Sequence, residues 1–461
     1  MKSDVIIIGG GASGLMAAYG AARTLVQSGS DASVIVLEKM PRPGRKIMLT
    51  GKGRCNFTNL KSWNDFSGHI RAGSELVKNA FFNFSPQSVI DFMEGNGMPS
   101  VVERGDRAYP ASYHASDVVD TLVRACNGVG VKIVQDCEVR GISVSKDDSE
   151  WRFNLGCSDG GSWLCKKLII ATGGLSYPGT GSTGDGYAWA ESFGHSITPL
   201  FPSLTALVPA GYKSEILPSN EGRFHIDRSS PLSETGKLFC GIQLKNIGAT
   251  LLVGGSEAQS EFGDIYFTDG GIEGPIGFQL SRKAVKAMTN GSKVALVLDL
   301  KSGVEREELS SRVKSLWDEV QKDPRSKGLK DKEKCRILLG KLMPWDLIPA
   351  FRACFPGIVR VERRSRTETK TWVDLSLICT ALKEWRFEIV GYVGYERAVV
   401  TAGGVSTSEI SRKTMESRLV PGLYFCGEIL DIDSDTGGYN LQTAFCSGLL
   451  AGESAAQSLQ D

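Results

Sequence analysis

The first forty residues hold a short apolar strand, a glycine cluster, a helix and a second strand in uninterrupted order. The β-branched run Val5–Ile8 precedes Gly9–Gly14, where the glycines follow the spacing G-x-G-x-x-G, and an alanine-rich segment covers 15–26. A second apolar run, Val34–Leu37, ends at Glu38. Because buried parallel strands are continuous apolar runs, this order predicts a strand–helix–strand unit whose glycine turn opens the helix.

Each part of this unit has its own physical task. Gly9 permits a tight turn, Gly11 lets the backbone approach a pyrophosphate, and Gly14 lets the helix pack close to the strand. The free N–H groups and the positive dipole end of the helix favour phosphates. Glu38, at the tip of the second strand, can accept hydrogen bonds from an adenosine ribose. We therefore predict a dinucleotide site; the acid favours a free ribose over a 2′-phosphate but does not separate FAD from NAD.

Composition limits the remaining classes. The 461 residues allow two or three domains, and a net charge of +1 gives no global field for nucleic acid. The basic run at 360–366 is interpreted as a solvated loop, with phosphate binding as the alternative. The eleven cysteines contain no C-x-x-C pair and the four histidines no ligand spacing, so we expect reduced thiols, no dithiol redox pair and no metal site. Neither a signal peptide nor a transmembrane segment is indicated, so we expect a cytoplasmic protein without a membrane partner.

Two further glycine-rich stretches need separate interpretation. Residues 168–174 are predicted to form a buried strand ending in Ala-Thr-Gly-Gly. In two-dinucleotide flavoproteins such a turn returns the chain to the FAD sheet; the alternative is an ordinary strand and turn. Residues 179–184 also match G-x-G-x-x-G, but they follow Tyr177-Pro178 rather than a strand, and no acid follows at a strand tip about 20 residues later. We reject a separate NAD fold there and expect a helix over 187–193, with Asp185 at a favourable cap position.

The C-terminal region contains another glycine turn that precedes a helix. Residues 421–428 form a strand that runs into a turn, and Asp435-Thr-Gly-Gly-Tyr-Asn440 precedes a small-residue helix over 441–448. Such a helix start presents N–H donors and a positive dipole end to an electron-rich group. In a flavoenzyme that group is the N1/C2=O edge of the ring; the alternative is an ordinary capped helix.

These stretches together resemble the BaiN-like, aminoacetone-oxidase-like flavoproteins (the YhiN group), within the broad FAD superfamily that includes succinate dehydrogenase and fumarate reductase flavoprotein subunits. The resemblance runs from residue 9 to 452 through the segments GGGASGLMAA, GRKIMLTGKGRCNFTN, ERGDRAYPASYHASDVVDTL, ATGGLSYPGTGSTGDGY, FTDGGIEGPIGFQLSR, VVTAGGVSTSEI, TMESRLVPGLYFCGEILDID and TGGYNLQTAFCSGLLAG. One departure is Asp269 in FTDGG, where we expect histidine in many relatives.

The fold expected is α/β, with a glutathione-reductase-type, Rossmann-like FAD-binding domain. Because the FAD signals lie at both ends, we assign 1–200 and 396–461 to this domain. The resemblance implies an inserted β-barrel-like domain, 201–302 and 361–395, and a small helical subdomain, 303–360. Domain insertion predicts a cleft between the domains that the flavin ring would face.

The loop 44–59 begins just after Glu38 and so starts beside the ribose. Arg45 and Lys46 are predicted to neutralise the pyrophosphate, while Lys52 and Arg54 would stabilise a reduced-flavin anion or an anionic substrate. Cys55, amid cations, is expected to have a lowered pKa and is a candidate proton donor; the alternative is packing under the ring. The catalytic candidates are Cys55, Arg54 and Tyr439, and Tyr109 and Asp269 are candidate substrate contacts.

The residues predicted to contact FAD come from every one of these motifs. They are Gly9, Gly11, Ala12, Ser13, Gly14, Glu38, Lys39, Arg45, Lys46, Thr50, Gly51, Gly53, Arg54, Cys55, Asn56, Val139, Ala171, Thr172, Gly173, Gly174, Gly427, Glu428, Asp431, Gly437, Gly438, Tyr439, Asn440 and Leu441.

The function expected is an FAD-dependent oxidoreductase that takes electrons from NADH or NADPH and reduces a conjugated C=C bond. The resemblance implies two substrate classes, steroid enones and a uridine of ribosomal RNA, so a small molecule or an RNA base is the expected partner. The alternatives are an amine (aminoacetone) oxidase using O₂ and a non-catalytic FAD-binding protein. The sequence leaves the substrate, the choice of nicotinamide and the oligomeric state open.

Overall fold

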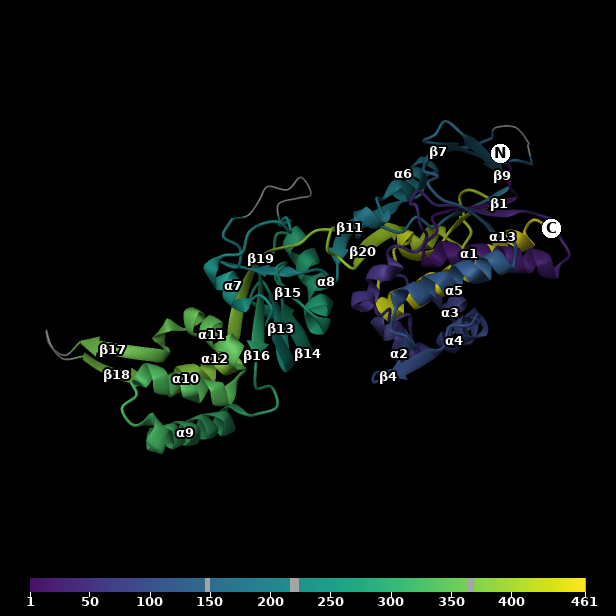
Figure 1. Cartoon of the computed structure of the whole chain (residues 1–461). Coiled ribbons are helices and arrows are strands. Elements are labelled where there is room, and N and C mark those ends of the chain that lie inside the picture. Colours follow the sequence, from purple (N-terminus) through teal and green to yellow (C-terminus); the bar gives the residue numbers. More distant parts are fainter. Residues whose placement is uncertain (146–149, 216–223, 364–368, 461) are drawn as a thin grey trace. The chain divides into compact units, whose positions relative to one another are not determined.

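The computed structural model describes residues 1–145, 150–215, 224–363 and 369–460 (Figure 1). Contacts divide the chain into two compact units. The first, Met1–Ser203 with Ala398–Asp461, contains both termini, and the second, Leu204–Arg397, is inserted into it. We call these the nucleotide unit and the barrel unit. The boundaries of the two units are the ones that contacts between residues give. The separate helical subdomain that we assign to 303–360 stays a prediction.

The nucleotide unit is organised by a parallel sheet in the order β21-β10-β1-β2-β6. Its strands are β1 (Val5–Ile8), β2 (Val34–Leu37), β6 (Lys132–Val134), β10 (Lys167–Ile170) and β21 (Leu423–Phe425). All four residues of β1 and of β2 are buried, as strands covered on both faces must be. Ile8 aligns with Leu37 and Ile170, so the glycine turn, the acid after β2 and the turn after β10 meet at one sheet edge.

Helices complete this unit. The helix after the first glycine turn, α1 (Ala12–Gln27), packs along the C-terminal helix α13 (Gly437–Gln457); Figure 1 shows the two, purple and yellow, side by side. The other helices are α2 (Trp63–Phe66), α3 (Ser74–Asn83), α4 (Pro86–Gly95), α5 (Ala115–Gly128) and α6 (Asp185–Ser192). The first and last helices of the chain thus share one core, although more than four hundred residues separate their starting points.

Three small antiparallel sheets surround this core. They consist of β3 (Thr58–Asn59), β4 (Ser100–Glu103) and β5 (Arg107–Pro110); β7 (Val139–Val144), β8 (Phe153–Cys157) and β9 (Ser162–Cys165); and β11 (Ile197–Ser203) with β20 (Val400–Val405). The chain leaves the unit at the end of β11 and re-enters it at Ala398, just before β20.

The barrel unit is built on six strands that close in the order β12-β15-β14-β13-β16-β19. Their bounds are Leu207–Pro209 (β12), Gln243–Val253 (β13), Ser256–Phe267 (β14), Ile272–Glu273 (β15), Val294–Asp299 (β16) and Trp385–Tyr392 (β19). Aromatic rings fill one part of the core: Phe239 lies 4.7 Å from Phe267, and Trp385 stacks on Phe387 with centroids 5.3 Å apart. The closed barrel confirms the predicted inserted β-barrel-like fold.

The rest of the barrel unit is mainly helical. It comprises α7 (Glu234–Phe239), α8 (Pro275–Thr289), α9 (Arg306–Lys322), α10 (Asp331–Leu342), α11 (Ile348–Cys354), α12 (Leu375–Lys383) and the hairpin β17 (Val359–Arg363) with β18 (Thr369–Val373). No helix within the described part of the chain is long and apolar enough to cross a membrane.

Candidate cofactor site

A pocket with an empty volume of about 870 Å³ lies at the carboxyl edge of the parallel sheet. Thirteen of the residues predicted to contact FAD line it: Gly9, Gly11, Ala12, Ser13, Glu38, Lys39, Arg45, Lys46, Val139, Ala171, Thr172, Gly173 and Glu428. They come from the ends of β1, β2, β10 and β21, which the sheet order brings together, and from the first turn of α1, the loop 44–59 and the start of β7.

The three motif glycines have the environments that their predicted tasks require. Gly9 has a φ of +101°, and a Cβ on it would lie 2.6 Å from the Ala171 carbonyl oxygen. A Cβ on Gly14 would lie 1.8 Å from the Gly9 carbonyl oxygen, so the helix can approach the strand only with glycine there. A Cβ on Gly11, in contrast, would meet nothing within 4 Å. The backbone of Gly11 is therefore open toward the pocket, as the approach of a pyrophosphate requires.

The remaining polar groups of the pocket also fit an adenosine diphosphate moiety. No acid stands in the first turn of α1, and no side chain caps it, so the helix start is free for phosphate. Glu38 is 8% exposed; its carboxylate accepts from Gly10 N–H at 2.7 Å and from Met40 N–H at 2.8 Å. Burial raises the pKa of this carboxyl, and the two N–H donors oppose that rise. The buried Thr172 hydroxyl has no hydrogen-bond partner among the described residues.

A second open helix start belongs to α13. Thr436 precedes it without a side-chain cap, and its first turn carries no acid. A Cβ on Gly437 would meet nothing within 4 Å, whereas one on Gly438 would lie within 3 Å of the Asn56 amide. The fold thus brings the loop 44–59 against the start of α13. Neither glycine lines the 870 Å³ pocket, so their predicted FAD contacts stay a prediction.

The loop 44–59 turns sharply beside the pocket. It forms a 3₁₀ helix over Ile47–Gly53 with a break, and both Lys52 (φ 58°) and Cys55 (φ 55°) adopt the left-handed conformation. Lys46 pairs with Glu428 at 2.6 Å, and Glu428 also accepts from Thr401 N–H at 2.8 Å. The charge of Lys46 is therefore balanced by an acid that lines the same pocket.

Cys55 does not have the environment that we expected from its neighbours. Its side chain is 0% exposed and belongs to the hydrophobic core of the nucleotide unit. Burial raises the pKa of the thiol to about 12, so the predicted lowering of the pKa is wrong. The neighbouring Arg45, Lys52 and Arg54 are exposed, whereas the thiol is packed in the apolar core. The packing role is the one that this environment favours.

Arg54 lies in a cluster with two tyrosines and an acid. Its guanidinium is 4.6 Å from the ring centroid of Tyr109 and 4.4 Å from that of Tyr113. It pairs with Glu103 at 2.6 Å, and the Tyr113 hydroxyl donates to the same carboxylate at 3.0 Å. We call Arg54, Glu103, Tyr109 and Tyr113 the arginine–tyrosine cluster. It places two candidates, Arg54 and Tyr109, in contact, while their roles in catalysis and substrate binding stay predictions.

Several pocket residues were missed by the sequence analysis. They are Ile8, Leu37, Arg42, Gly44, Ile47, Cys137, Thr180, Gly181, Ser182, Asp185, Trp189 and Ala444. Four of them belong to the second glycine motif and the helix start after it, where Lys39 pairs with Asp185 at 2.6 Å. The motif that we rejected as a separate NAD fold begins inside a 3₁₀ turn, Pro178–Thr180, and forms one wall of this pocket. Its glycines were the available signal.

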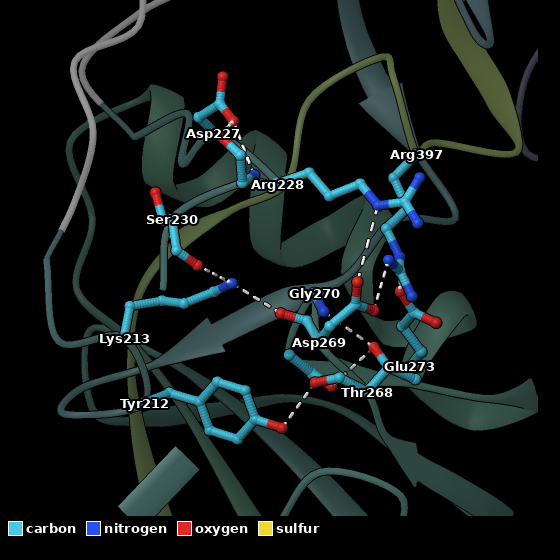
Figure 2. A network of polar contacts seen from close by, with 12 residues as sticks. Tyr212, Lys213, Asp227, Arg228, Ser230, Thr268, Asp269, Gly270, Glu273 and Arg397 are labelled. Carbon is cyan, nitrogen blue, oxygen red and sulfur yellow. Dashed lines mark hydrogen bonds and ion pairs between the residues drawn. The ribbon is translucent and has the colours of Figure 1, made fainter. Parts of the chain in front are cut away.

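Asp269 lies in the barrel unit, within a polar network that Figure 2 shows. Its carboxylate accepts from Arg397 at 2.7 Å, and its carbonyl oxygen accepts from Lys213 Nζ at 2.7 Å. Lys213 also donates to the Ser230 carbonyl oxygen at 2.6 Å. The network holds the Thr-Asp-Gly-Gly loop in place, so Asp269 has a structural partner for each of its oxygen types. Its role as a substrate contact stays a prediction.

The basic run at 360–366 is only partly described. Arg360 pairs with Asp374 at 2.7 Å, whereas residues 364–368, including Arg364 and Arg366, lie outside the described residues. The prediction of phosphate binding there stays a prediction.

The fold and the pocket, together with the family and the relatives of the chain, define a Rossmann-type FAD-binding oxidoreductase. The model of the HI0933-like protein Rossmann domain matches residues 3–454, and the chain belongs to this family. It is 31% identical over 458 residues to the 3-dehydro-bile acid delta(4,6)-reductase of Clostridium scindens, covering 98% of both chains. It is 32% identical over 448 residues to the ribosomal RNA dihydrouridine synthase of Haemophilus influenzae (96% of both chains), and 29% identical over 453 residues to that of Escherichia coli (97% of this chain and 96% of the relative). These findings confirm the resemblance to the BaiN and YhiN group.

Proposed function

We propose that this oxidoreductase uses NADH or NADPH to reduce a conjugated C=C bond. The observation that carries the proposal is the similarity along the whole chain, at 31% and 32% identity, to two relatives whose names denote that reaction on different substrates. When bound, FAD supplies a hydride equivalent to the double bond. The amine oxidase and the non-catalytic FAD-binding protein remain the alternatives that the experiment must exclude.

The residues of the nucleotide unit would divide the work of holding the cofactor. The N–H groups at the start of α1 and the open backbone of Gly11 would bind the pyrophosphate, and Glu38 would bind the ribose. The N–H groups at the start of α13 would stabilise negative charge at the pyrimidine edge of the ring. The Lys46–Glu428 pair would orient the loop 44–59 between these two helix starts.

Two acceptor classes are candidates, a steroid-like enone and a uridine in ribosomal RNA. The arginine–tyrosine cluster favours the uridine, because planar guanidinium and aromatic faces stack unpaired bases. The net charge of +1 is small for a large RNA footprint. The enone therefore remains the alternative substrate within the same reaction class.

The test is a pair of half-reactions. The FAD-loaded protein is reduced anaerobically with NADH or NADPH, and its flavin absorbance is followed after mixing with O₂, a steroid enone or a uridine-containing rRNA fragment. We expect an enone or the rRNA fragment to reoxidise the flavin faster than buffer, with the reduced product found by mass spectrometry. Peroxide formation from aminoacetone without either reduction would support the oxidase, and a flavin that neither nicotinamide reduces would support the non-catalytic protein.

Salt dependence separates the two acceptors. Contacts with phosphates release counterions, so rRNA binding should weaken steeply between low and physiological salt. Binding that is indifferent to salt would exclude the RNA substrate. Tyr113→Ala should then weaken binding of the rRNA fragment and leave reduction of the flavin unchanged.

A further inference from the structure

A short backbone pairing fixes residues 69–71 against the segment that leads into α13. Ile70 and Ser434 form an antiparallel bridge, Asp435 N–H donates to the His69 carbonyl oxygen at 3.0 Å, and Arg71 N–H donates to the Asp433 carbonyl oxygen at 2.7 Å. The positions of these residues therefore depend on the main chain and not only on side-chain contacts.

The side chains at this pairing form a compact charged group. Asp435 is 4% exposed, and its two carboxylate oxygens accept from the guanidinium of Arg71. Oδ2 of Asp435 also lies 2.9 Å from Nδ1 of His69. Because an ionised carboxylate only accepts hydrogen bonds, Nδ1 of His69 carries the proton. Arg71 balances the buried carboxylate charge, and the contact with Nδ1 leaves Nε2 as the nitrogen that can take up and release a proton.

The imidazole ring is held on a second side as well. His69 stacks on Tyr439, with ring centroids 4.3 Å apart and an interplanar angle of 18°. Tyr439 stands in the first turn of α13 and is 4% exposed. The His69 side chain is 32% exposed, and Nε2 has no hydrogen-bond partner within the described ranges. The ring is therefore fixed at one nitrogen and one face, while the other nitrogen stays available.

We propose that His69 is the catalytic acid that protonates the substrate carbon, with Asp435 and Arg71 as positioning residues. The assignment rests on the proposed function. One carbon of the double bond takes the hydride that the cofactor supplies, and the other takes the proton from Nε2 of the imidazolium. One π bond is lost, two C–H bonds form, and the neutral imidazole regains a proton from water. Cys55 and Tyr439, the two acid candidates from the sequence, are both buried.

His69→Asn tests the chemical step, because asparagine can keep the contact with Asp435 but lacks a group equivalent to Nε2. We expect acceptor reduction to fall at least ~100-fold, the usual lower bound for a lost general acid. Flavin reduction by NAD(P)H and reoxidation by O₂, which need no proton at carbon, should stay within about twofold of wild type. Added imidazole should restore part of the acceptor rate, and the matched control His114→Gln should change none of these rates.

Two outcomes overturn the assignment: wild-type acceptor reduction in His69→Asn, or an equal loss of acceptor and O₂ reactivity, which marks a structural role. If the wild-type protein reduces neither enone nor uridine, the proposed function fails and the assignment fails with it. Full acceptor reduction in His69→Asn, beside an active wild type, overturns the assignment alone.

The contact between His69 and Asp435 can be tested without measuring turnover. In apoprotein labelled with ¹⁵N-histidine, neutral His69 should show the tautomer with the proton on Nδ1, and Asp435→Asn should shift that signal most among the four histidines. A neutral His69 with the proton on Nε2 would overturn the assignment, because Nδ1 would then not donate to Asp435 and the carboxylate would not hold the ring.

Discussion

At the residue scale, the same substitution at two glycines of one motif should affect different properties, FAD binding at Gly11 and stability at Gly14. Gly11→Ala places a methyl group in open space within the pocket, so the apoprotein should keep its Tm while FAD binds about tenfold more weakly, ~1.4 kcal/mol. Gly14→Ala places its methyl 1.8 Å from a carbonyl oxygen, so it should destabilise the fold by about 1–3 kcal/mol. Flavin titration and thermal unfolding of both apoproteins measure the difference. A Gly11→Ala protein with wild-type FAD affinity would show that the pyrophosphate does not bind next to Gly11.

Cys55 permits a second test at this scale. Because its thiol is buried and the pKa is raised to about 12, it stays protonated and shielded at neutral pH. Cys55→Ala should keep full acceptor turnover with FAD retained, at a stability cost on the order of 1 kcal/mol for the small cavity. Steady-state rates and thermal unfolding check this expectation. A large loss of turnover with FAD still bound would show that Cys55 takes part in catalysis.

The sequence predicted single residues well where one motif determines the environment. Gly9, Gly11 and Glu38 follow from local spacing, and all three line the pocket. Cys55 was misjudged because neighbouring charges in sequence do not show which way a side chain points. Likewise, spacing could not reveal that the sulfur atoms of Cys137 and Cys157, both free thiols, lie 3.5 Å apart. His69 was missed because its partners, Asp435 and Tyr439, are more than 360 residues away.

At the element scale, a negative charge placed at the start of α13 should affect apoprotein stability and FAD binding in opposite directions. Gly437 opens into free space and its φ is not positive, so a side chain fits there. Gly437→Glu puts an acid in the first helical turn, which should stabilise the apoprotein by about 0.3–1 kcal/mol through the helix dipole. The same acid should weaken FAD binding and lower the flavin reduction potential, because it repels negative charge on the ring. Gly437→Gln, of equal size, should do neither.

Apoprotein unfolding, FAD titration and redox potentiometry give the three readouts for Gly437→Glu. An unchanged potential with bound FAD would mean that α13 does not point at the electron-rich edge of the ring.

The sequence pattern predicted the type of an element, helix or strand, but not its first and last residues. The inserted domain was predicted as β-barrel-like, and the structure places β13 (Gln243–Val253) and β14 (Ser256–Phe267) there. Both strands are long because they pair with each other along their whole extent, a long-range interaction that a local pattern does not contain. The helix predicted over 187–193 is α6 (Asp185–Ser192), which begins at the acid expected near its start.

At the scale of the whole molecule, buried thiols should make the fold sensitive to alkali. Burial raises the pKa of Cys55, Cys126, Cys426 and Cys446 from 9.0 to about 12. The folded state therefore holds these protons where the unfolded chain releases them. Their contribution to stability is complete below pH 9 and is lost as the pH rises toward 12, by up to ~1.4 kcal/mol per pH unit for each thiol.

Thermal unfolding between pH 8 and 10 checks this sign. Wild-type Tm should fall with pH, and Cys446→Ala should fall less steeply. Equal slopes in the two proteins would show that these thiols are not the groups that titrate.

The division into two units supports a deletion that isolates the cofactor site. The chain leaves the nucleotide unit at Ser203 and returns at Ala398. These ends are close, because Ser203 lies opposite Val400 in the antiparallel β11–β20 pair, where facing Cα atoms are about 4.5–5.5 Å apart. Every residue that lines the 870 Å³ pocket belongs to this unit. Replacing 204–397 by a short Gly-Ser linker should therefore leave a folded protein that binds FAD.

We expect the deletion protein to unfold cooperatively and to bind FAD within about threefold of the full chain, a difference below ~1 kcal/mol. Gly11→Ala within the deletion protein is the matched control, and it should weaken FAD binding by the same factor as in the full chain. A folded deletion protein without FAD affinity would show that the barrel unit contributes to binding. An equal loss from Gly11→Ala in both backgrounds would place the pyrophosphate site in the nucleotide unit alone, since a shared site would make that loss depend on residues 204–397.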